Sequence, residues 1–152
     1  MRFPILFLAT GGFVGYVPVA PGTFGSLVAI PLFWLFAGVQ RDSVALSLVV
    51  FALLTLAACW VAAQAEVILR EHDSHAIVID EIVGYLAATL FLTPTWSHAV
   101  VAFLIFRVLD IVKPFPASYV DERLAGGYGV VLDDVVSGLY ANLATRLAFL
   151  LL

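Results

Sequence analysis

The sequence predicts an all-α fold, a polytopic integral membrane helical bundle that forms a single domain over residues 1–152. Two features of its composition support this prediction. Of the 152 residues, 63% are hydrophobic and only 12% are charged, and the mean hydropathy is +1.09. Typical soluble domains are about 45–50% apolar and about 25% charged, and a soluble fold this small could not bury so much apolar surface.

The spacing of the apolar runs predicts about five membrane segments. A membrane helix needs roughly 20 apolar residues, and residues 44–65 are the clearest example because they carry no formal charge. Residues 24–39 form a second, slightly shorter candidate. Three further candidates begin or end in charged residues, at about 77–93, 98–113 and 133–152. Residues 3–17 are apolar but contain three glycines, which predicts a short re-entrant or interfacial segment.

Several classes of protein are disfavoured by the same sequence. A net charge of −4 with seven basic residues leaves no basic stripe for a nucleic-acid partner. The single cysteine, Cys59, excludes an internal disulfide and a cysteine-based metal site. Pro18 and Pro21 flank the one small-residue stretch where a signal peptidase could cut, so we expect the N-terminus to be retained.

The basic residues predict an orientation, because cytoplasmic ends of membrane helices are enriched in Lys and Arg. With five spans and a cytoplasmic N-terminus, one basic residue, Arg41, lies in an outside loop. The cytoplasmic ends then carry Arg2, Arg70, Lys113 and Arg123. This distribution favours a cytoplasmic face for the polar helix ends.

Most charged residues gather on that one predicted face. Consecutive membrane helices alternate in direction, so each polar helix end can be assigned to a side. The shared side receives residues 20–26 (APGTFGS), Glu66, Arg70, His72, Asp73, Asp80, Glu81, Arg107, Asp110, Lys113, Asp133 and Asp134. The opposite side receives Arg41, Asp42 and His98.

Five of these residues predict a metal site: Asp80, Glu81, Asp110, Asp133 and Asp134. Acidic residues also favour helix N-termini, which is an alternative explanation for all of them except Asp110, near the end of a helix. Three converging acidic groups are better explained by a divalent cation that offsets their repulsion. Oxygen ligands suit Mg²⁺ or Mn²⁺, and the lack of a Cys/His set argues against zinc.

Basic and small residues beside these acids predict phosphate binding. Arg107 and Lys113 flank Asp110 at three-residue spacing and form one polar strip on a helix. An ion pair with Asp110 and a snorkelling lysine would explain this strip equally well. Gly22, Thr23 and Ser26 begin a helix, where free N–H groups bind anions, although small residues there often only permit close packing.

Close packing is the preferred explanation for Ser26 and for a set of other small residues in the predicted spans. These are Gly84, Ser137, Gly138 and Ala141. Asp73 and His72 are further candidates for the site, but they lie in a polar loop where such residues are most often solvated.

Four sequence blocks resemble the phosphatidylglycerophosphatase A family, in the same order and at similar spacings between about residues 12 and 142. They are YVPVAPGTFGSLVAIPL, HDSHAIVIDEIVGY, FRVLDIVKPFP and GGYGVVLDDVVSGLYAN. Members of this family are integral inner-membrane proteins of bacteria. The resemblance implies Mg²⁺-dependent removal of the terminal phosphate of phosphatidylglycerophosphate, which gives phosphatidylglycerol.

The family motifs fall on residues of each block: Gly22, Thr23, Gly25, Ser26, Asp73, Asp80, Glu81, Gly84, Arg107, Asp110, Lys113, Pro114, Gly126, Gly127, Gly129, Asp133 and Asp134. We expect the acids to hold Mg²⁺ and the basic groups to bind phosphate. Water is favoured over a carboxylate as the nucleophile. A cation or ion-coupled transporter is the alternative, which the absence of a sequence repeat and of mid-span acids disfavours.

Overall fold

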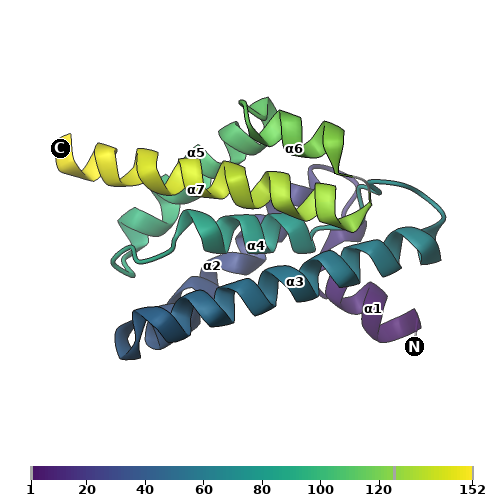
Figure 1. Cartoon of the computed structure of the whole chain (residues 1–152), viewed down its shortest axis with the longest axis horizontal. Coiled ribbons are helices and arrows are strands. Elements are labelled where there is room, and N and C mark those ends of the chain that lie inside the picture. Colours follow the sequence, from purple (N-terminus) through teal and green to yellow (C-terminus); the bar gives the residue numbers. More distant parts are fainter. Residues whose placement is uncertain (1, 125, 152) are drawn as a thin grey trace.

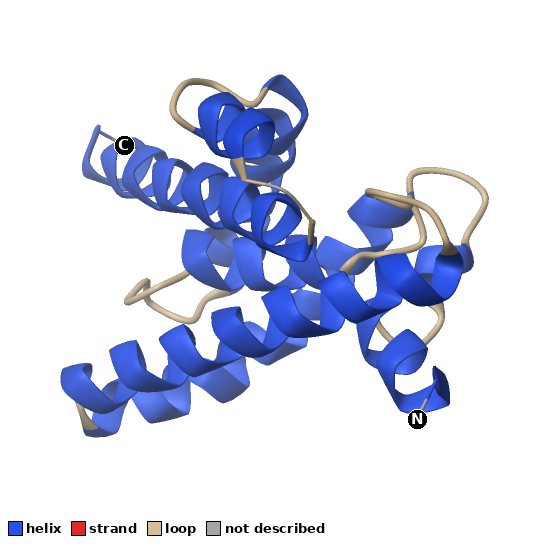
Figure 2. Cartoon of the chain, turned by 45° about the vertical axis from the view of Figure 1, so that its right-hand side comes forward, coloured by secondary structure: helices blue, strands red, loops and turns tan. Residues whose placement is uncertain are grey.

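The structure, a computed structural model, describes residues 2–124 and 126–151. These residues form seven α-helices and one 3₁₀ turn, with no strand among them, which confirms the all-α prediction (Figure 2). The helices are α1 (Arg2–Ala9), α2 (Pro21–Asp42), α3 (Val44–Leu69), α4 (Ile79–Ala88), α5 (Trp96–Val112), α6 (Ala117–Arg123) and α7 (Gly127–Leu151), and the 3₁₀ turn is Val14–Tyr16. Figure 1 shows α4 as a short helix between the much longer α3 and α7.

Two helices, α2 and α3, are long and apolar enough to cross a membrane. They contain the predicted spans 24–39 and 44–65. The helix predicted over 77–93 is much shorter than expected, because α4 has 10 residues. At 1.5 Å per residue it is about 15 Å long, roughly half of the ~30 Å hydrocarbon core of a bilayer.

The short helix α4 is the most enclosed element of the bundle, and it packs against α2, α3, α5 and α7. Seven of its 10 residues are buried. Gly84 and Gly138 bring α4 and α7 together so closely that a Cβ on Gly138 would overlap the carbonyl oxygen of Gly84. The buried residues Ser137 and Ala141 lie on the same helix. The predicted packing role is confirmed for Gly84 and Gly138, and the burial of Ser137 and Ala141 agrees with it.

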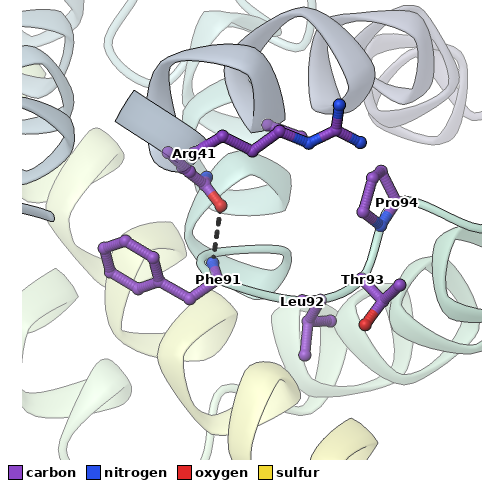
Figure 3. Close-up of a pocket in the computed structure, with 7 residues that line it drawn as sticks. Arg41, Phe91, Leu92, Thr93 and Pro94 are labelled. Carbon is purple, nitrogen blue, oxygen red and sulfur yellow. Dashed lines mark hydrogen bonds between the residues drawn. The ribbon is translucent and has the colours of Figure 1, made fainter. Parts of the chain in front are cut away.

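Polar side chains meet the backbone where α4 ends. The Asn142 amide donates to the carbonyl oxygens of Ala88 and Leu90, at 3.0 and 2.9 Å. Arg146 donates to the same Leu90 oxygen at 2.8 Å and to Asn142 Oδ1 at 2.8 Å. The Gln40 side-chain oxygen accepts from the Phe91 N–H at 2.9 Å (Figure 3). These side chains satisfy backbone groups that the helix itself leaves without partners.

The last helix begins earlier than the sequence predicts. We expected a span over 133–152 that starts with Asp133 and Asp134, but α7 begins at Gly127. Gly126 has a φ of +68°, and a Cβ on Gly127 would overlap the backbone of α3. The glycines therefore place the first turn of α7 directly against α3, and the two acids lie inside the helix. Leu152, the predicted end of this span, lies outside the described residues.

The N-terminal segment is a short helix followed by a turn. In the predicted segment 3–17, α1 ends at Ala9, and Gly11 and Gly12 have φ values of +56° and +71°. The carbonyl oxygen of Ala9 accepts from the N–H of Val78 at 2.8 Å. This hydrogen bond ties the end of α1 to the residue immediately before α4.

Candidate active site

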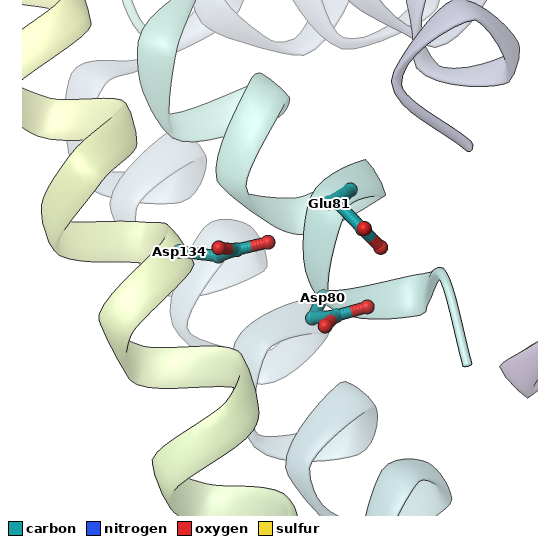
Figure 4. Close-up of side chains that lie close together, drawn as sticks. All are labelled: Asp80, Glu81 and Asp134. Atoms are coloured by element: carbon teal, nitrogen blue, oxygen red, sulfur yellow. The ribbon is translucent and has the colours of Figure 1, made fainter. Parts of the chain in front are cut away.

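Three carboxylates converge where α4 begins. Asp80 and Glu81 lie in the first turn of α4, and Asp134 lies on the facing side of α7 (Figure 4). One oxygen of each carboxylate lies within 4.8 Å of the others. Asp80 is 8% exposed and Asp134 is 3% exposed. The three residues are called the acidic triad below.

Each member of the acidic triad has a buried oxygen without a hydrogen-bond partner among the described residues. These atoms are Asp80 Oδ1, Glu81 Oε2 and Asp134 Oδ2. Buried polar atoms are normally paired, and buried like charges repel one another. A divalent cation would remove both penalties, and carboxylate oxygens are the ligands that Mg²⁺ and Mn²⁺ prefer. The acidic triad therefore has the donor set and the unpaired atoms of a metal site.

Arg107 and Asp110 on α5 border the acidic triad. Arg107 Nη1 lies 2.5 Å from Asp110 Oδ2 and 3.9 Å from Glu81 Oε1. Asp110 is itself 9% exposed and interacts with Asp134 and Asp80. The ion pair that the sequence offered as a structural explanation is present. Because the Arg107 Nε has no partner among the described residues, this guanidinium keeps an unused donor beside the carboxylates.

Lys113 and Asp133 form a second ion pair, next to the triad. Lys113 ends α5 with a left-handed φ of 46°, and its Nζ lies 2.5 Å from Asp133 Oδ2. The Asp133 side chain is 1% exposed, and its Oδ1 accepts from the Asp134 N–H at 2.9 Å. Asp133 therefore lies outside the acidic triad and contacts both Lys113 and the backbone of Asp134. The Lys113 side chain is 32% exposed, so it lies at the rim of the site.

The start of α2 faces Glu81 and Arg107. A Cβ on Gly22 would overlap the Glu81 carboxylate and would lie 3.2 Å from Arg107 Nη2. Only glycine permits this approach, so the backbone of α2 lies directly beside the charged groups. The Ser26 hydroxyl donates to the carbonyl oxygen of Gly22 at 3.0 Å and Thr23 is half-buried. The structure thus places Gly22 closest to the charges, while the Ser26 hydrogen bond remains within its own helix.

His72 and Asp73 lie in the exposed loop between α3 and α4. Glu66 Oε1 lies 2.6 Å from His72 Nδ1 and accepts from the Asp73 N–H at 2.9 Å. The His72 side chain is 71% exposed. A Cβ on Gly126 would lie 3.5 Å from Glu66 Oε2, so Glu66 links this loop to the start of α7. The sequence places Glu66 on the shared polar side but does not mark it as a site residue, because a glutamate near a helix end has no distinctive spacing.

A family model described as phosphatidylglycerophosphatase A matches residues 7–149. The chain belongs to this family. The phosphatidylglycerophosphatase A of Haemophilus influenzae is 36% identical over 139 residues, which cover 91% of this chain and 84% of that relative. The Escherichia coli phosphatidylglycerophosphatase A is 35% identical over 140 residues, with 91% and 79% covered.

A third relative carries a different name. A Bacteroides thetaiotaomicron protein, named provisionally as a phosphatidylinositol-3-phosphatase, is 35% identical over 152 residues, covering 95% of this chain and 92% of the relative. No solved structure matches the chain. The family and the two similarly named relatives confirm the activity predicted from the four sequence blocks. The protein is a phosphatidylglycerophosphatase, a phosphomonoesterase of phospholipid biosynthesis.

The two ends of the bundle differ in how well they suit a phosphatase reaction. The cavity at the opposite end of the bundle, about 350 Å³ in volume, is lined by Ala37, Gln40, Arg41 and residues 91–94. None of these lining residues carries a carboxylate (Figure 3). The acidic triad, with its neighbouring Arg107 and Lys113, is the better candidate for a reaction at a phosphate ester.

Proposed function

We propose that the acidic triad is the site where the terminal phosphomonoester of phosphatidylglycerophosphate is hydrolysed, and that it holds Mg²⁺. The observation that carries this proposal is the buried, unpaired oxygen on each of three neighbouring carboxylates. A bound divalent cation supplies Lewis-acid polarisation of phosphoryl oxygens and neutralises their charge. The chain itself provides the ligands, the cationic groups around the phosphate and a proton acceptor.

Arg107 and Lys113 are the phosphate-binding groups in this proposal. Guanidinium and ammonium groups form short, charge-assisted hydrogen bonds to phosphate oxygens. Asp110 fixes the position of Arg107 and Asp133 fixes that of Lys113, so these two carboxylates act chiefly as positioning residues. Gly22 leaves room beside Arg107 and brings the first turn of α2 within reach of the same anion.

Water is the proposed nucleophile. It attacks phosphorus opposite the glycerol oxygen and loses a proton to a carboxylate of the site, the phosphorus–oxygen ester bond breaks, and the glycerol oxygen takes up a proton from solvent. The products are phosphatidylglycerol and inorganic phosphate. Arg107 and Lys113 stabilise the phosphoryl oxygens as the bond breaks.

We further propose that five segments lie in the bacterial inner membrane, with the site on the cytoplasmic side. The segments are α2, α3, α4 with the turn that follows it, α5 and α7. Irregular backbone is tolerated at membrane depth only where protein groups satisfy it, and Asn142, Arg146 and Gln40 do so after α4. The placement of Arg2, Arg70, Lys113 and Arg123 supports this orientation.

Phosphate release by the purified protein in detergent tests the proposed site. Wild-type protein should release phosphate from phosphatidylglycerophosphate with Mg²⁺ and stop when EDTA is added. Asp134→Asn should remove this activity, whereas Asp42→Asn, which changes an exposed carboxylate at the other end of α2, should not. EDTA-resistant release or a fully active Asp134→Asn variant would contradict the proposed metal site.

A further inference from the structure

An apolar groove runs along the face of α4 that points away from α7. It has a volume of about 500 Å³, and all of its lining side chains are aliphatic except one phenylalanine. Ile79, Ile82, Val83 and Leu86 form its floor. Their spacing of three and four residues places them on a single side of the helix. Residues 32–39 of α2 and 54–61 of α3 contribute the walls, and Leu8 of α1 lies at one end.

Small side chains on α3 create the hollow. Ala57 and Ala58 line the groove where larger apolar residues occupy most of the same helix. Ala57 is exposed, and the rim residues Leu35 and Leu54 are 71% and 41% exposed. The groove is therefore open to the outside of the bundle between these rim residues. Both of its walls are the candidate membrane helices, so in the proposed membrane arrangement the opening faces the hydrocarbon of the bilayer.

The groove begins beside the candidate active site. Its first floor residue, Ile79, directly precedes Asp80, so the two side chains project about 100° apart around α4. From Ile79 to Leu86 the groove extends about 10 Å along the helix axis, away from the acidic triad. It therefore leads from the level of the proposed phosphate site into the apolar part of the bundle.

The lining of the groove fits a hydrocarbon chain better than a second protein. None of its lining side chains is polar or charged, so none would fix the position of a partner protein by a hydrogen bond or an ion pair. A flexible acyl chain needs no polar anchor in the groove, because its headgroup is held by polar groups at the neighbouring site.

We propose that this groove binds one acyl chain of the phospholipid substrate; the inference rests on the proposed function. In phosphatidylglycerophosphate, two glycerol units and a phosphodiester separate the terminal phosphate from the acyl chains. A phosphate held at the acidic triad on one face of α4 thus leaves the lipid enough length to reach the neighbouring face. Seating one chain along α4 orients the headgroup toward Arg107 and the triad.

Filling the groove tests the proposal. Ala57→Leu places a larger side chain in the hollow, and Ala52→Leu makes the same change at an exposed alanine of α3 that does not line it. The two positions lie about 140° apart around the helix. Ala57→Leu should lower kcat/KM for dihexadecanoyl phosphatidylglycerophosphate about tenfold, equivalent to about 1.4 kcal/mol. It should leave kcat/KM for the dihexanoyl lipid within twofold, and Ala52→Leu should change neither.

A labelling experiment keeps the test independent of turnover. Phosphatidylglycerophosphate with a photoreactive diazirine in one hexadecanoyl chain should label residues 54–61 or 79–86 of the wild-type protein, and Ala57→Leu should reduce this labelling while Ala52→Leu retains it. Absence of hydrolysis with this labelling intact would overturn the proposed function but not the groove. Labelling spread over all apolar helices, or insensitive to Ala57→Leu, would overturn the groove whatever the activity. So would an Ala57→Leu variant with altered oligomeric mass and unchanged chain-length preference, which would indicate a contact between copies.

Discussion

The two ends of α4 treat polar groups in opposite ways. Where α4 ends, the side chains of Asn142, Arg146 and Gln40 pair with the backbone of Ala88, Leu90 and Phe91. Where it begins, Asp80, Glu81 and Asp134 each keep a buried oxygen without a partner among the described residues. Only 12% of the residues in the chain are charged, so the use of polar side chains at each end is informative. We therefore interpret the end of α4, at residues 88–91, as a structural anchor (the anchoring end), and its start as the ligand site proposed above.

A single helix, α7, connects these two ends. It carries Asp134 at one end of α4, Gly138 against Gly84 in the middle, and Asn142 at the other end. The register between α4 and α7 therefore sets the distance between Asp80 and Asp134. Changes at the anchoring end should therefore reach the acidic triad through this register.

The largest effect is expected at the triad itself. Asp80→Asn and Glu81→Gln each remove a carboxylate charge with little change in shape. Each should lower kcat at saturating Mg²⁺ by at least about 10³-fold, which corresponds to about 4 kcal/mol. Phosphate release by the purified variants measures the loss, and their thermal unfolding in detergent should stay within a few degrees of wild type. Near-wild-type rates in both variants would exclude the triad as the metal site.

The next largest effect is expected where α4 and α7 touch. Gly138→Ala places a Cβ against the carbonyl oxygen of Gly84, so the helices must separate. We expect the free energy of unfolding to fall by about 1–3 kcal/mol, as in other overpacked sites, and the metal affinity to fall with it. Gly38→Ala is the matched control, because a Cβ there meets no atom within 4 Å. Equal behaviour of the two variants in unfolding and Mn²⁺ titration would show that the close approach is unimportant.

A smaller effect is expected from the anchoring end. Asn142→Leu leaves the carbonyl oxygen of Ala88 without its partner and weakens the bonding of Leu90. An unsatisfied buried group costs about 1–3 kcal/mol, and loosening of α4 should weaken Mn²⁺ binding at the distant triad. Unfolding and Mn²⁺ titration of the purified variant measure both effects. If the metal affinity of a destabilised Asn142→Leu protein were unchanged, the two ends of α4 would be independent.

The smallest effect is expected at the rim. Lys113 is partly exposed, so Lys113→Ala should raise KM for the lipid about tenfold, or about 1.4 kcal/mol, with a lesser change in kcat. Added salt should reduce the difference from wild type, because exposed charges are screened. Arg41→Ala, at the opposite end of the molecule, should leave KM unchanged. Unaltered KM and kcat in Lys113→Ala would remove this residue from phosphate binding.

The sequence predicts which residue types gather at the candidate site better than it predicts their arrangement. Helical spacing predicted the strip of Arg107, Asp110 and Lys113, and alternation of helix direction predicted that acids from several helices would lie on one side, although only three of the five expected acids form the triad. The sequence could not separate Asp133 from Asp134, because adjacent helical residues differ only by the direction in which they project. Asp134 joins the triad and Asp133 pairs with Lys113 as a result of how α7 is rotated against α4 and α5.

The helix boundaries were harder to predict for a related reason. The apolar run continues through residues 77–93, so hydropathy predicts a helix of that length. The helix ends at Ala88 instead, and Asn142 and Arg146 donate hydrogen bonds to backbone carbonyl oxygens at and after its end. Glycines at 126, 127 and 129 are typical of a loop, yet Gly127 and Gly129 lie in the first turn of α7. Glycine is needed at these two positions because α3 and Leu124 approach too closely for a side chain. The short helix α6 was not predicted at all. Its seven residues have no apolar periodicity long enough to stand out.

Direct measurement of metal binding tests the central claim, that the acidic triad is a divalent-cation site. Mn²⁺ would be titrated into the purified protein and followed by electron paramagnetic resonance, with Asp134→Asn and the exposed control Asp42→Asn alongside wild type. We predict saturable binding to wild type and Asp42→Asn that competes with Mg²⁺, and loss of that binding in Asp134→Asn. Wild-type affinity in a folded Asp134→Asn variant, or no saturable binding to wild type, would contradict the account.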